Sequence, residues 1–364
     1  MHPASKKGFK IIFYFLSALT LASISWRVSP ALRYAEGWST FYYDKHFIAQ
    51  EAGNGNIGSL VSSFFLQFFH VPSHGIVLMM LLFLLVEMLF VVVLNRIRKT
   101  VFSYVVSFVI TVCLAITLMS NLGRVSFLSV LGMGDASNMR YMKYCNMAGD
   151  EDWDGVIGEW QSGGPEGNLL NQNIINMAMA EKGMLHEHLD DNPCADINSV
   201  YVSEIQSEYV AAMISDVYYS MGHIAQSQRY AFEANEKFDN CSPRLLQRLI
   251  KTNIIYGQYR VARKYLAKLS DAIYYKVWCQ RYGKLLDDKA VEADRELSLK
   301  RKCLNIDNKF SGFGGLDKDL LQIARATKGT HQSRTTVQYL SALYRLARYK
   351  DEYESLINEF KLCR

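Results

Sequence analysis

Residues 76–94 read IVLMMLLFLLVEMLFVVVL, and this stretch decides how the rest of the chain is organised. Eighteen of its nineteen residues are apolar, and the single charged one is Glu87. At about 1.5 Å of rise per residue, a helix of this length is about as long as the hydrocarbon core of a bilayer is thick. A helix on the surface of a water-soluble protein would carry a polar face, and this stretch has none. The sequence therefore predicts a membrane span.

Two more apolar runs predict further spans, so that residues 1–133 form a membrane domain with about three crossings. Residues 11–26 follow a basic start. We interpret them as an uncleaved anchor, and a cleaved signal peptide is the alternative. Residues 101–119 come after the tight connection 95–100, and we expect them to form a helical hairpin with the span at 76–94.

The segment between the first two spans is rich in aromatic residues. Residues 29–58 include Tyr34, Trp38 and Phe41, and aromatic side chains beside a bilayer are typical of the headgroup layer. We therefore expect a polar, aromatic connection there. Residues 60–69 (LVSSFFLQFF) are apolar but too short to cross, which predicts an interfacial or re-entrant helix.

The distribution of basic residues predicts the orientation. One dense basic segment precedes the first crossing, and the other connects the second crossing to the third. Two crossings separate the segments, so they must lie on the same side of the membrane. The positive-inside rule assigns that side to the cytoplasm. Residues 136–364 would then face the periplasm, and we expect the protein in a bacterial inner membrane. The two segments contain Lys6, Lys7 and Lys10, and Arg96, Arg98 and Lys99.

Composition excludes some classes of function. A net charge of +5, from 40 basic and 35 acidic residues, is too small a surplus to predict a nucleic-acid partner. The seven cysteines are widely spaced and form no CxxC pair, which excludes a zinc knuckle or a thioredoxin-type site. We interpret them as free, buried thiols, and disulfides in an exported domain are the alternative.

Residues 136–364 predict pairs of helices that meet at glycines. Gly222 and Gly257 each separate two runs with helical periodicity, and each is followed eight residues later by a tyrosine, Tyr230 and Tyr265. A glycine closes a helix because it takes the left-handed conformation without steric cost. The aromatic residue is then expected on the inward face of the next helix. The predicted pairs are residues 201–221 with 224–238, 243–256 with 259–269, and 335–348 with 351–362.

Two earlier glycines, Gly149 and Gly183, extend the pattern. The four glycines are 34, 39 and 35 residues apart. This spacing is close to that of tetratricopeptide (TPR) repeats, which stack helical hairpins into a solenoid. The sequence therefore predicts an all-α chain with a TPR-like helical domain, and a helical bundle with tyrosines in its core is the alternative.

One short motif is reminiscent of a calcium site. Asp150, Asp152, Asp154 and Gly155 have the D-x-D-x-D-G pattern that opens an EF-hand loop. The twelfth position is Gln161, so the bidentate carboxylate is missing. The same residues also suit a polar turn between two helices, which we favour, and we expect no bound metal.

Glu87 is the candidate functional residue of the membrane domain. A carboxylate at that depth is costly unless it is protonated, paired or facing a cavity. A proton or ion relay is one interpretation. The other, which we favour, is a protonated carboxyl hydrogen-bonded to a hydroxyl of a neighbouring helix, such as Ser107 or Thr111.

No catalytic motif or cofactor site follows from the remaining residues. His70 and His74 are separated by a proline, and His186 and His188 have no third ligand nearby in the sequence. We interpret residues 307–315 (DNKFSGFGG) as an irregular connector, since a phosphate-binding loop would need the GxxxxGK[ST] pattern. The basic residues between positions 244 and 264 are expected to be solvated.

Two regions resemble a bacterial family of multi-pass inner-membrane proteins known only as a domain of unknown function. Residues 51–84, EAGNGNIGSLVSSFFLQFFHVPSHGIVLMMLLFL, resemble its "FxxQFxxxPxxG" approach to a span. Residues 171–185, 217–236, 242–269 and 274–282 resemble its TPR-like C-terminal half. Members usually carry more spans than the three visible here. The resemblance implies no activity and no catalytic residues.

These observations favour a membrane-held scaffold or adaptor without catalysis. Its partners would be the lipid bilayer and a protein or peptide bound to the helical domain. The alternative is part of a polytopic transporter or of an envelope-polymer enzyme, with a path through the membrane around Glu87.

Overall fold

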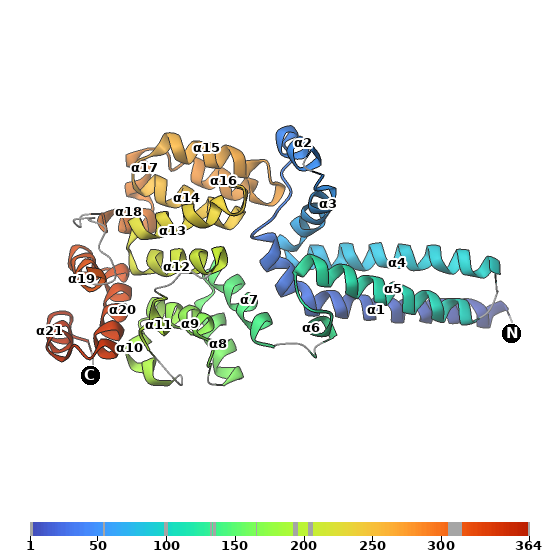
Figure 1. The fold of residues 1–364 in the computed structure, drawn as a ribbon, viewed down its shortest axis with the longest axis horizontal. Coiled ribbons are helices and arrows are strands. Elements are labelled where there is room, and N and C mark those ends of the chain that lie inside the picture. Colours follow the sequence, from blue (N-terminus) through green and yellow to red (C-terminus); the bar gives the residue numbers. More distant parts are fainter. Residues whose placement is uncertain are drawn as a thin grey trace. The chain divides into compact units, whose positions relative to one another are not determined.

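The structure is a computed structural model of the chain (Figure 1). It describes residues 3–53, 55–97, 101–131, 133, 136–164, 166–191, 196–202, 207–304 and 315–362. These residues form helices and no β-strand, which confirms the all-α prediction. The chain divides into two compact units, Met1–Lys143 and Tyr144–Arg364, here called the membrane unit and the helical unit. The division falls within α7 (Ala136–Gly149).

Three long helices pack against one another in the membrane unit (Figure 1). They are α1 (Pro3–Glu36), α4 (Pro72–Ile97) and α5 (Val101–Gly123). By length and composition, Gly8–Glu36, Pro72–Ile97 and Val101–Gly123 can each cross a membrane. The shorter helices are α2 (Lys45–Gly53), α3 (Ile57–Leu66), the 3₁₀ turn η1 (Gln67–His70) and α6 (Phe127–Leu131).

The outward faces of the three long helices are apolar and exposed, as expected of a surface that lies in lipid. Ile12, Leu85 and Val105 are 61%, 56% and 53% exposed, whereas the inward-facing Met79 and Phe83 are at most 2% exposed. A water-soluble protein rarely exposes so continuous an apolar surface. The chain is therefore a membrane protein.

The first long helix continues further than the sequence predicts. The connection expected from Ser29 is helical as far as Glu36, although Pro30 lies within the helix. Proline lacks an N–H, so it leaves the carbonyl of Trp26 without its intrahelical donor. The Ser29 hydroxyl donates to that carbonyl at 2.8 Å, which offsets the loss. The connection therefore begins after Glu36 and not at Ser29, as was expected.

The aromatic residues of this region are largely buried within the unit. Tyr34, Trp38, Phe41 and Tyr42 are each at most 8% exposed, and Tyr43 is 47% exposed. Their rings pack edge-on, for example Tyr34 on Trp38 at 5.5 Å between centroids. Most of them thus form an aromatic core at the end of α1, which the expectation of a headgroup layer missed.

The approach to the second span has a packing explanation. Pro72 starts α4, where its missing N–H costs nothing. Gly75 lies on the ring of Phe69, and a Cβ at this position would be 2.6 Å from the ring atoms Cγ and Cδ1. The Gln67 amide donates to the hydroxyl of Tyr43 and to the carbonyl of Phe64. The Phe69–Gly75 contact packs η1 on the first turn of α4, and the bonds of Gln67 join η1 to α3 and to the segment at Tyr43.

The helical unit is a succession of short antiparallel helices (Figure 1). Neighbouring helices pack as α8 on α9, α12 on α13, α14 on α15, α19 on α20 and α20 on α21. The helices are α8 (Trp153–Gly163), α9 (Leu169–Lys182), α10 (Leu185–His188), η2 (Leu189–Asp191), α11 (Ile197–Val200), α12 (Glu208–Met221), α13 (Ile224–Glu236), α14 (Pro243–Ile255), α15 (Tyr259–Ser270), η3 (Ile273–Tyr275), α16 (Lys276–Gly283), α17 (Asp288–Ala293), α18 (Arg295–Lys302), α19 (Leu316–Ala326), α20 (His331–Ala347) and α21 (Lys350–Phe360). The helix expected from Tyr201 begins only at Glu208, because Ser207 caps it.

Three of the four expected glycines end helices in the left-handed conformation. Gly183, Gly222 and Gly257 have φ of 76°, 87° and 69°. Gly149 does not, and the prediction for it was wrong. Its helix closes two residues later, at Glu151 with φ of 57°, where the Asp152 N–H donates to the Met147 carbonyl at 2.9 Å. A residue other than glycine can thus take the left-handed conformation at this turn, because the closing hydrogen bond holds the backbone in place.

The buried positions after each turn are shifted by one residue from the expected ones. Tyr230 and Tyr265 are only partly buried, whereas Ala231 and Leu266, one residue further on, are 0% and 6% exposed. Tyr230 instead stacks on Tyr218 at 5.5 Å. The two tyrosines therefore flank the core, and the buried positions after these two turns are taken by Ala231 and Leu266.

Candidate functional site

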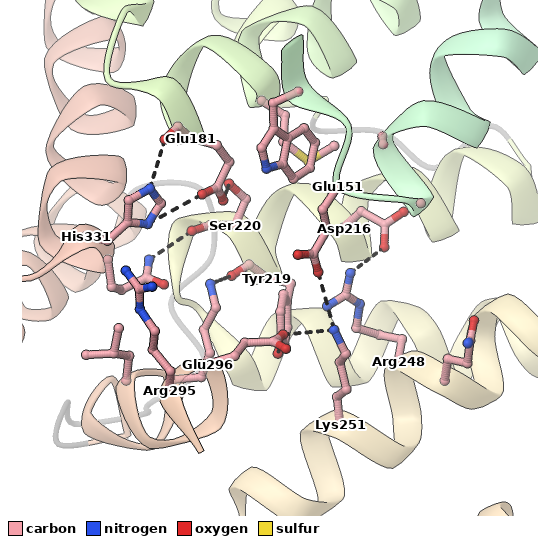
Figure 2. Close-up of a pocket in the computed structure, with 18 of the residues that line it drawn as sticks. Glu151, Glu181, Asp216, Tyr219, Ser220, Arg248, Lys251, Arg295, Glu296 and His331 are labelled. Atoms are coloured by element: carbon pink, nitrogen blue, oxygen red, sulfur yellow. Dashed lines mark hydrogen bonds and ion pairs between the residues drawn. The ribbon is translucent and has the colours of Figure 1, made fainter. Parts of the chain in front are cut away.

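The helical unit contains a charged cavity of about 520 Å³ (Figure 2). Its walls come from the turn between α7 and α8, from α9, α12, α14, α16 and α18, and from the first turn of α20. Six arginines and lysines and five carboxylates line it, together with two tryptophans. Most of these charges are already paired within the chain.

Tyr219 lies at the centre of the charged lining. Its hydroxyl donates to Glu296 Oε1 at 2.6 Å, and the guanidinium carbon of Arg248 lies 3.7 Å from its ring centroid. The ammonium of Lys300 lies 4.5 Å from the same centroid and donates to the Tyr219 carbonyl. Burial, together with the charge of Glu296, raises the pKa of Tyr219 well above its ordinary value. The phenol is thus a neutral donor, and the aromatic ring is a platform for cations.

Glu296 is ionised and held by several donors. Lys251 Nζ is 2.9 Å from Glu296 Oε1. Burial alone would raise the pKa of Glu296, but the charge of Lys251 and the hydrogen bonds from Lys251 and Tyr219 outweigh it and hold the pKa at about 2. Burial opposes the charge on Lys251 as well, yet Glu296 keeps the pKa of Lys251 above its ordinary value. The two groups form a partly buried ion pair.

Asp216 is shared by two arginines. Arg244 Nη2 and Arg248 Nη2 lie 2.6 Å and 2.8 Å from its two carboxylate oxygens. Burial works against its charge, but the two guanidiniums keep the pKa of Asp216 below its usual range. One carboxylate is thus shared by two cations, and one positive charge is left over.

The other carboxylates of the lining are also engaged (Figure 2). Glu181 accepts from the Ser220 hydroxyl at 2.5 Å. Asp294 caps α18 by accepting from the backbone of Glu296 and Leu297, and Glu151 lies 3.5 Å from Lys251. Every carboxylate that lines the cavity therefore already has a donor or a cation beside it.

Two arginines of the cavity remain without an anion. Arg281 and Arg295 are exposed, and within the described residues neither forms an ion pair with a carboxylate. The guanidinium carbon of Arg281 lies 5.4 Å from the centroid of the Tyr282 ring. This contact leaves the N–H donors of Arg281 open. In addition, Nε and Nη1 of Arg248 are buried and reach no acceptor in this part of the chain. A ligand of this cavity would have to supply acceptor atoms and negative charge.

The candidate calcium residues have other roles. Asp152 caps α8 by accepting from the Gly155 N–H at 3.0 Å, and Asp154 pairs with Lys182 at 2.7 Å. Asp150 follows the end of α7. No group of three or more His, Cys, Asp and Glu side chains that could hold a metal ion occurs within the described ranges.

Glu87 is fully buried between the long helices. Its Oε1 accepts from the Ser17 hydroxyl of α1 at 3.0 Å. The partners expected on α5 do not serve this carboxyl: Ser107 donates to the Ser103 carbonyl at 2.8 Å, and Thr111 Oγ1 is buried without a partner in the described chain. The expected hydroxyl of a neighbouring helix is present, but it is that of Ser17 on α1 and not one of the two named on α5.

The histidines and cysteines form no common centre. His70 lies 3.3 Å from Glu36, and His186 lies 3.3 Å from the Ser341 hydroxyl. Five cysteines are free thiols. Cys194, Cys363 and positions 307–314 of the connector expected at 307–315 lie outside the described residues. The free thiols are Cys113, Cys145, Cys241, Cys279 and Cys303.

The sequence contained a signal for the cavity that its interpretation missed. Arg244, Arg248 and Lys251 were expected to be solvated, but they lie on the cavity wall. Their spacing of i, i+4 and i+7 places them on one face of α14. Arg260 and Arg263 of α15 are exposed, as expected of solvated residues. The cationic face of α14 could be recognised from the sequence. The cavity itself could not, because the carboxylates opposite this face come from helices distant in sequence.

Comparison with known proteins identifies the family. A model described as a family of unknown function (DUF6057) matches residues 5–134 and 124–349. No curated protein and no solved structure matches the chain. The family model covers both the membrane unit and most of the helical unit, so the chain belongs to the DUF6057 family.

Proposed function

We propose that this protein is a membrane-held scaffold whose helical unit binds an acidic segment of a partner protein in the charged cavity. One observation carries the proposal. Every carboxylate that lines the cavity is engaged, whereas Arg281 and Arg295 have no anionic partner within the described residues. An acidic segment would supply the missing charge.

The size and lining of the cavity support a segment of chain as the ligand. A volume of about 520 Å³ exceeds what one anionic group needs and lies in the range of ligand pockets. Trp153 and Trp278 line it beside the arginines. Tryptophan, tyrosine and arginine are the residues that contribute most to binding in protein interfaces.

The architecture of the helical unit also supports a scaffold. The helices α9, α12 and α14 end at Gly183, Gly222 and Gly257, and each of them contributes side chains to the one cavity. TPR-like arrays bind partner segments in this manner, and we extend the proposal to a TPR-like mode of binding.

We assign the helical unit to the periplasmic side of a bacterial inner membrane. The support is the basic N-terminus and the basic connection 95–100, of which residues 98–100 lie outside the described chain. A C-terminal alkaline phosphatase fusion should be active and a green fluorescent protein fusion at the same position dark. The reverse pattern would contradict the orientation and leave the binding proposal unaffected.

Binding is tested with the full chain in detergent. Short fluorescent peptides rich in glutamate are compared with the same peptides carrying glutamine. We expect the glutamate peptides to bind and the glutamine peptides to bind at least about tenfold more weakly. A tenfold difference in affinity corresponds to a difference of about 1.4 kcal/mol in binding free energy. Equal binding of the two series, or no binding of either, would overturn the proposal.

A matched pair of variants localises the binding. Arg295→Gln removes an unpaired charge from the cavity and should weaken the glutamate peptide about fivefold to tenfold. Arg263→Gln removes an exposed arginine from α15, outside the cavity, and should leave the affinity unchanged. Equal losses in both variants would indicate general attraction to a basic surface.

One observation favours a second candidate function, a path through the membrane around Glu87. Glu87 Oε2 is buried without a partner in the described chain, and the hydroxyls of Ser107 and Thr111 are buried on α5. A relay requires a titratable carboxyl. If Glu87→Gln abolishes the cellular phenotype while deletion of the helical unit does not, this function replaces the scaffold.

A further inference from the structure

A second hollow, in the membrane unit, has the chemistry of a phospholipid site. It is a groove of about 340 Å³ between α1 and α6. Leu19 and Ile24 line it from α1, and Val130 and Leu131 line it from α6. The groove lies on the apolar surface of a helix that can cross a membrane, so hydrocarbon chains are its natural surroundings.

One end of the groove is charged. Arg27 lies exposed at that end and donates from Nη1 to the carbonyl of Leu131 at 2.7 Å. This bond fastens the last turn of α6 and orients the guanidinium. No described carboxylate pairs with Arg27, so its remaining donors are open to an anion. Trp26 beside it is 72% exposed, as is typical of the boundary between hydrocarbon and headgroups.

The Thr20 hydroxyl in the groove donates to the Leu16 carbonyl at 3.0 Å, and the remaining polar side chains follow the order of the groups in a phospholipid. Arg27 comes at the interfacial end, and Ser23 lies one helical turn deeper with its hydroxyl free. Leu19 lies a further turn along, so the groove covers about 12 Å of α1. A phosphate at Arg27 would place the glycerol ester oxygens near Ser23 and an acyl chain against Leu19 and Ile24.

We propose that the groove between α1 and α6 binds one glycerophospholipid, with its phosphate on Arg27 and one acyl chain along α1. The bound lipid would also cover Leu131 and so hold α6 against α1. This site lies in the membrane unit and does not depend on the function proposed for the cavity.

Native mass spectrometry of the full chain tests the proposal. The protein is reconstituted in vesicles of phosphatidylethanolamine and phosphatidylglycerol, extracted into detergent, and the retained lipid is counted. We expect one phospholipid per chain, and Arg27→Gln should lower its retention roughly fivefold, the contribution of one basic residue near anionic headgroups. Unchanged retention would overturn the proposal.

Three controls separate the site from other causes. Ser23→Phe fills the groove while leaving Arg27 and its bond to Leu131 in place, and it should also release the lipid. Arg96→Gln removes an exposed arginine at the far end of α4 and should have no effect; a loss equal to that of Arg27→Gln would contradict a specific site. Inorganic phosphate should not displace the lipid. Displacement would indicate a site for free phosphate and would also overturn the proposal.

Discussion

The guanidinium of Arg248 lies over the ring of Tyr219, with its central carbon 3.7 Å from the ring centroid. The same tyrosine donates its hydroxyl to Glu296 at 2.6 Å. The ring thus joins the arginines bound to Asp216 with the ion pair of Glu296 and Lys251. The charges of the cavity form one connected network around Tyr219, and its members should respond to substitution together.

Tyr219→Phe should lower the free energy of unfolding by about 1.5–3 kcal/mol, because a hydrogen bond to a charged group is lost. The measurement is urea unfolding of the detergent-solubilised chain, followed by circular dichroism. Tyr265→Phe is the control, since Tyr265 is partly buried and its hydroxyl has no partner in the described chain. Equal losses in the two variants would show that the bond to Glu296 contributes nothing.

Glu296→Gln should destabilise the protein at neutral pH and progressively less in acid. The pKa of Glu296 is about 2 in the folded chain, below its ordinary value of 4.5, so the unfolded chain takes up a proton first as the pH falls. The stabilisation, at most about 3 kcal/mol, is complete above pH 4.5 and is lost toward pH 2. Melting temperatures of wild type and variant should therefore approach each other as the pH falls from 4.5 toward 2. A constant difference would contradict the ionised state of Glu296.

Gly222→Ala should be more damaging than Gly257→Ala. Both glycines have positive φ, which costs an alanine about 1 kcal/mol. At Gly222 the added Cβ would also lie 2.9 Å from Gln332 Nε2 and 3.0 Å from Ile323, whereas at Gly257 no atom lies within 4 Å. Overpacking adds about 1–3 kcal/mol. Thermal unfolding of the two variants measures the difference, and equal melting temperatures would show that the turn at Gly222 is not packed as described.

Gly75→Ala should disrupt the membrane unit. The new Cβ would lie 2.6 Å from the ring of Phe69, which is fully buried and cannot move without displacing η1. We expect a loss of about 1–3 kcal/mol, seen as a lower melting temperature and a smaller yield of monodisperse protein in detergent. Gly58→Ala has no atom within 4 Å and should behave as wild type. A stable Gly75→Ala protein would contradict the packing of η1 on α4.

The spans and the hairpins could be predicted from the sequence, because each rests on local physics. A run of apolar residues such as Ile76–Leu94 has one favourable environment, and a glycine such as Gly222 ends a helix by its own conformational freedom. The end of α1 could not be predicted, because it depends on whether Ser29 satisfies the carbonyl that Pro30 leaves open. The turn at Glu151 is held by a backbone bond between Asp152 and Met147, which has no signature in the residue types.

The candidate site was harder to predict than the fold. The face of Arg244, Arg248 and Lys251 is visible as a spacing on one helix. Whether those charges are free depends on Asp216 from α12 and Glu296 from α18, and only the folded chain brings these together. The unpaired Arg295 carries no distinguishing pattern in the sequence, since exposed arginines are common on helices.

Charge reversal in the cavity is the most direct test of whether the unpaired arginines receive an acidic segment of a partner protein. The affinity of the full chain for a glutamate-rich peptide and for its lysine-rich counterpart is measured by fluorescence anisotropy, for the wild type and for the double variant Arg281→Glu, Arg295→Glu. We expect the affinity of the variant for the glutamate peptide to fall at least about tenfold and its affinity for the lysine peptide to rise. A variant that binds the glutamate peptide as tightly as the wild type would contradict the proposal that the unpaired arginines receive an acidic partner.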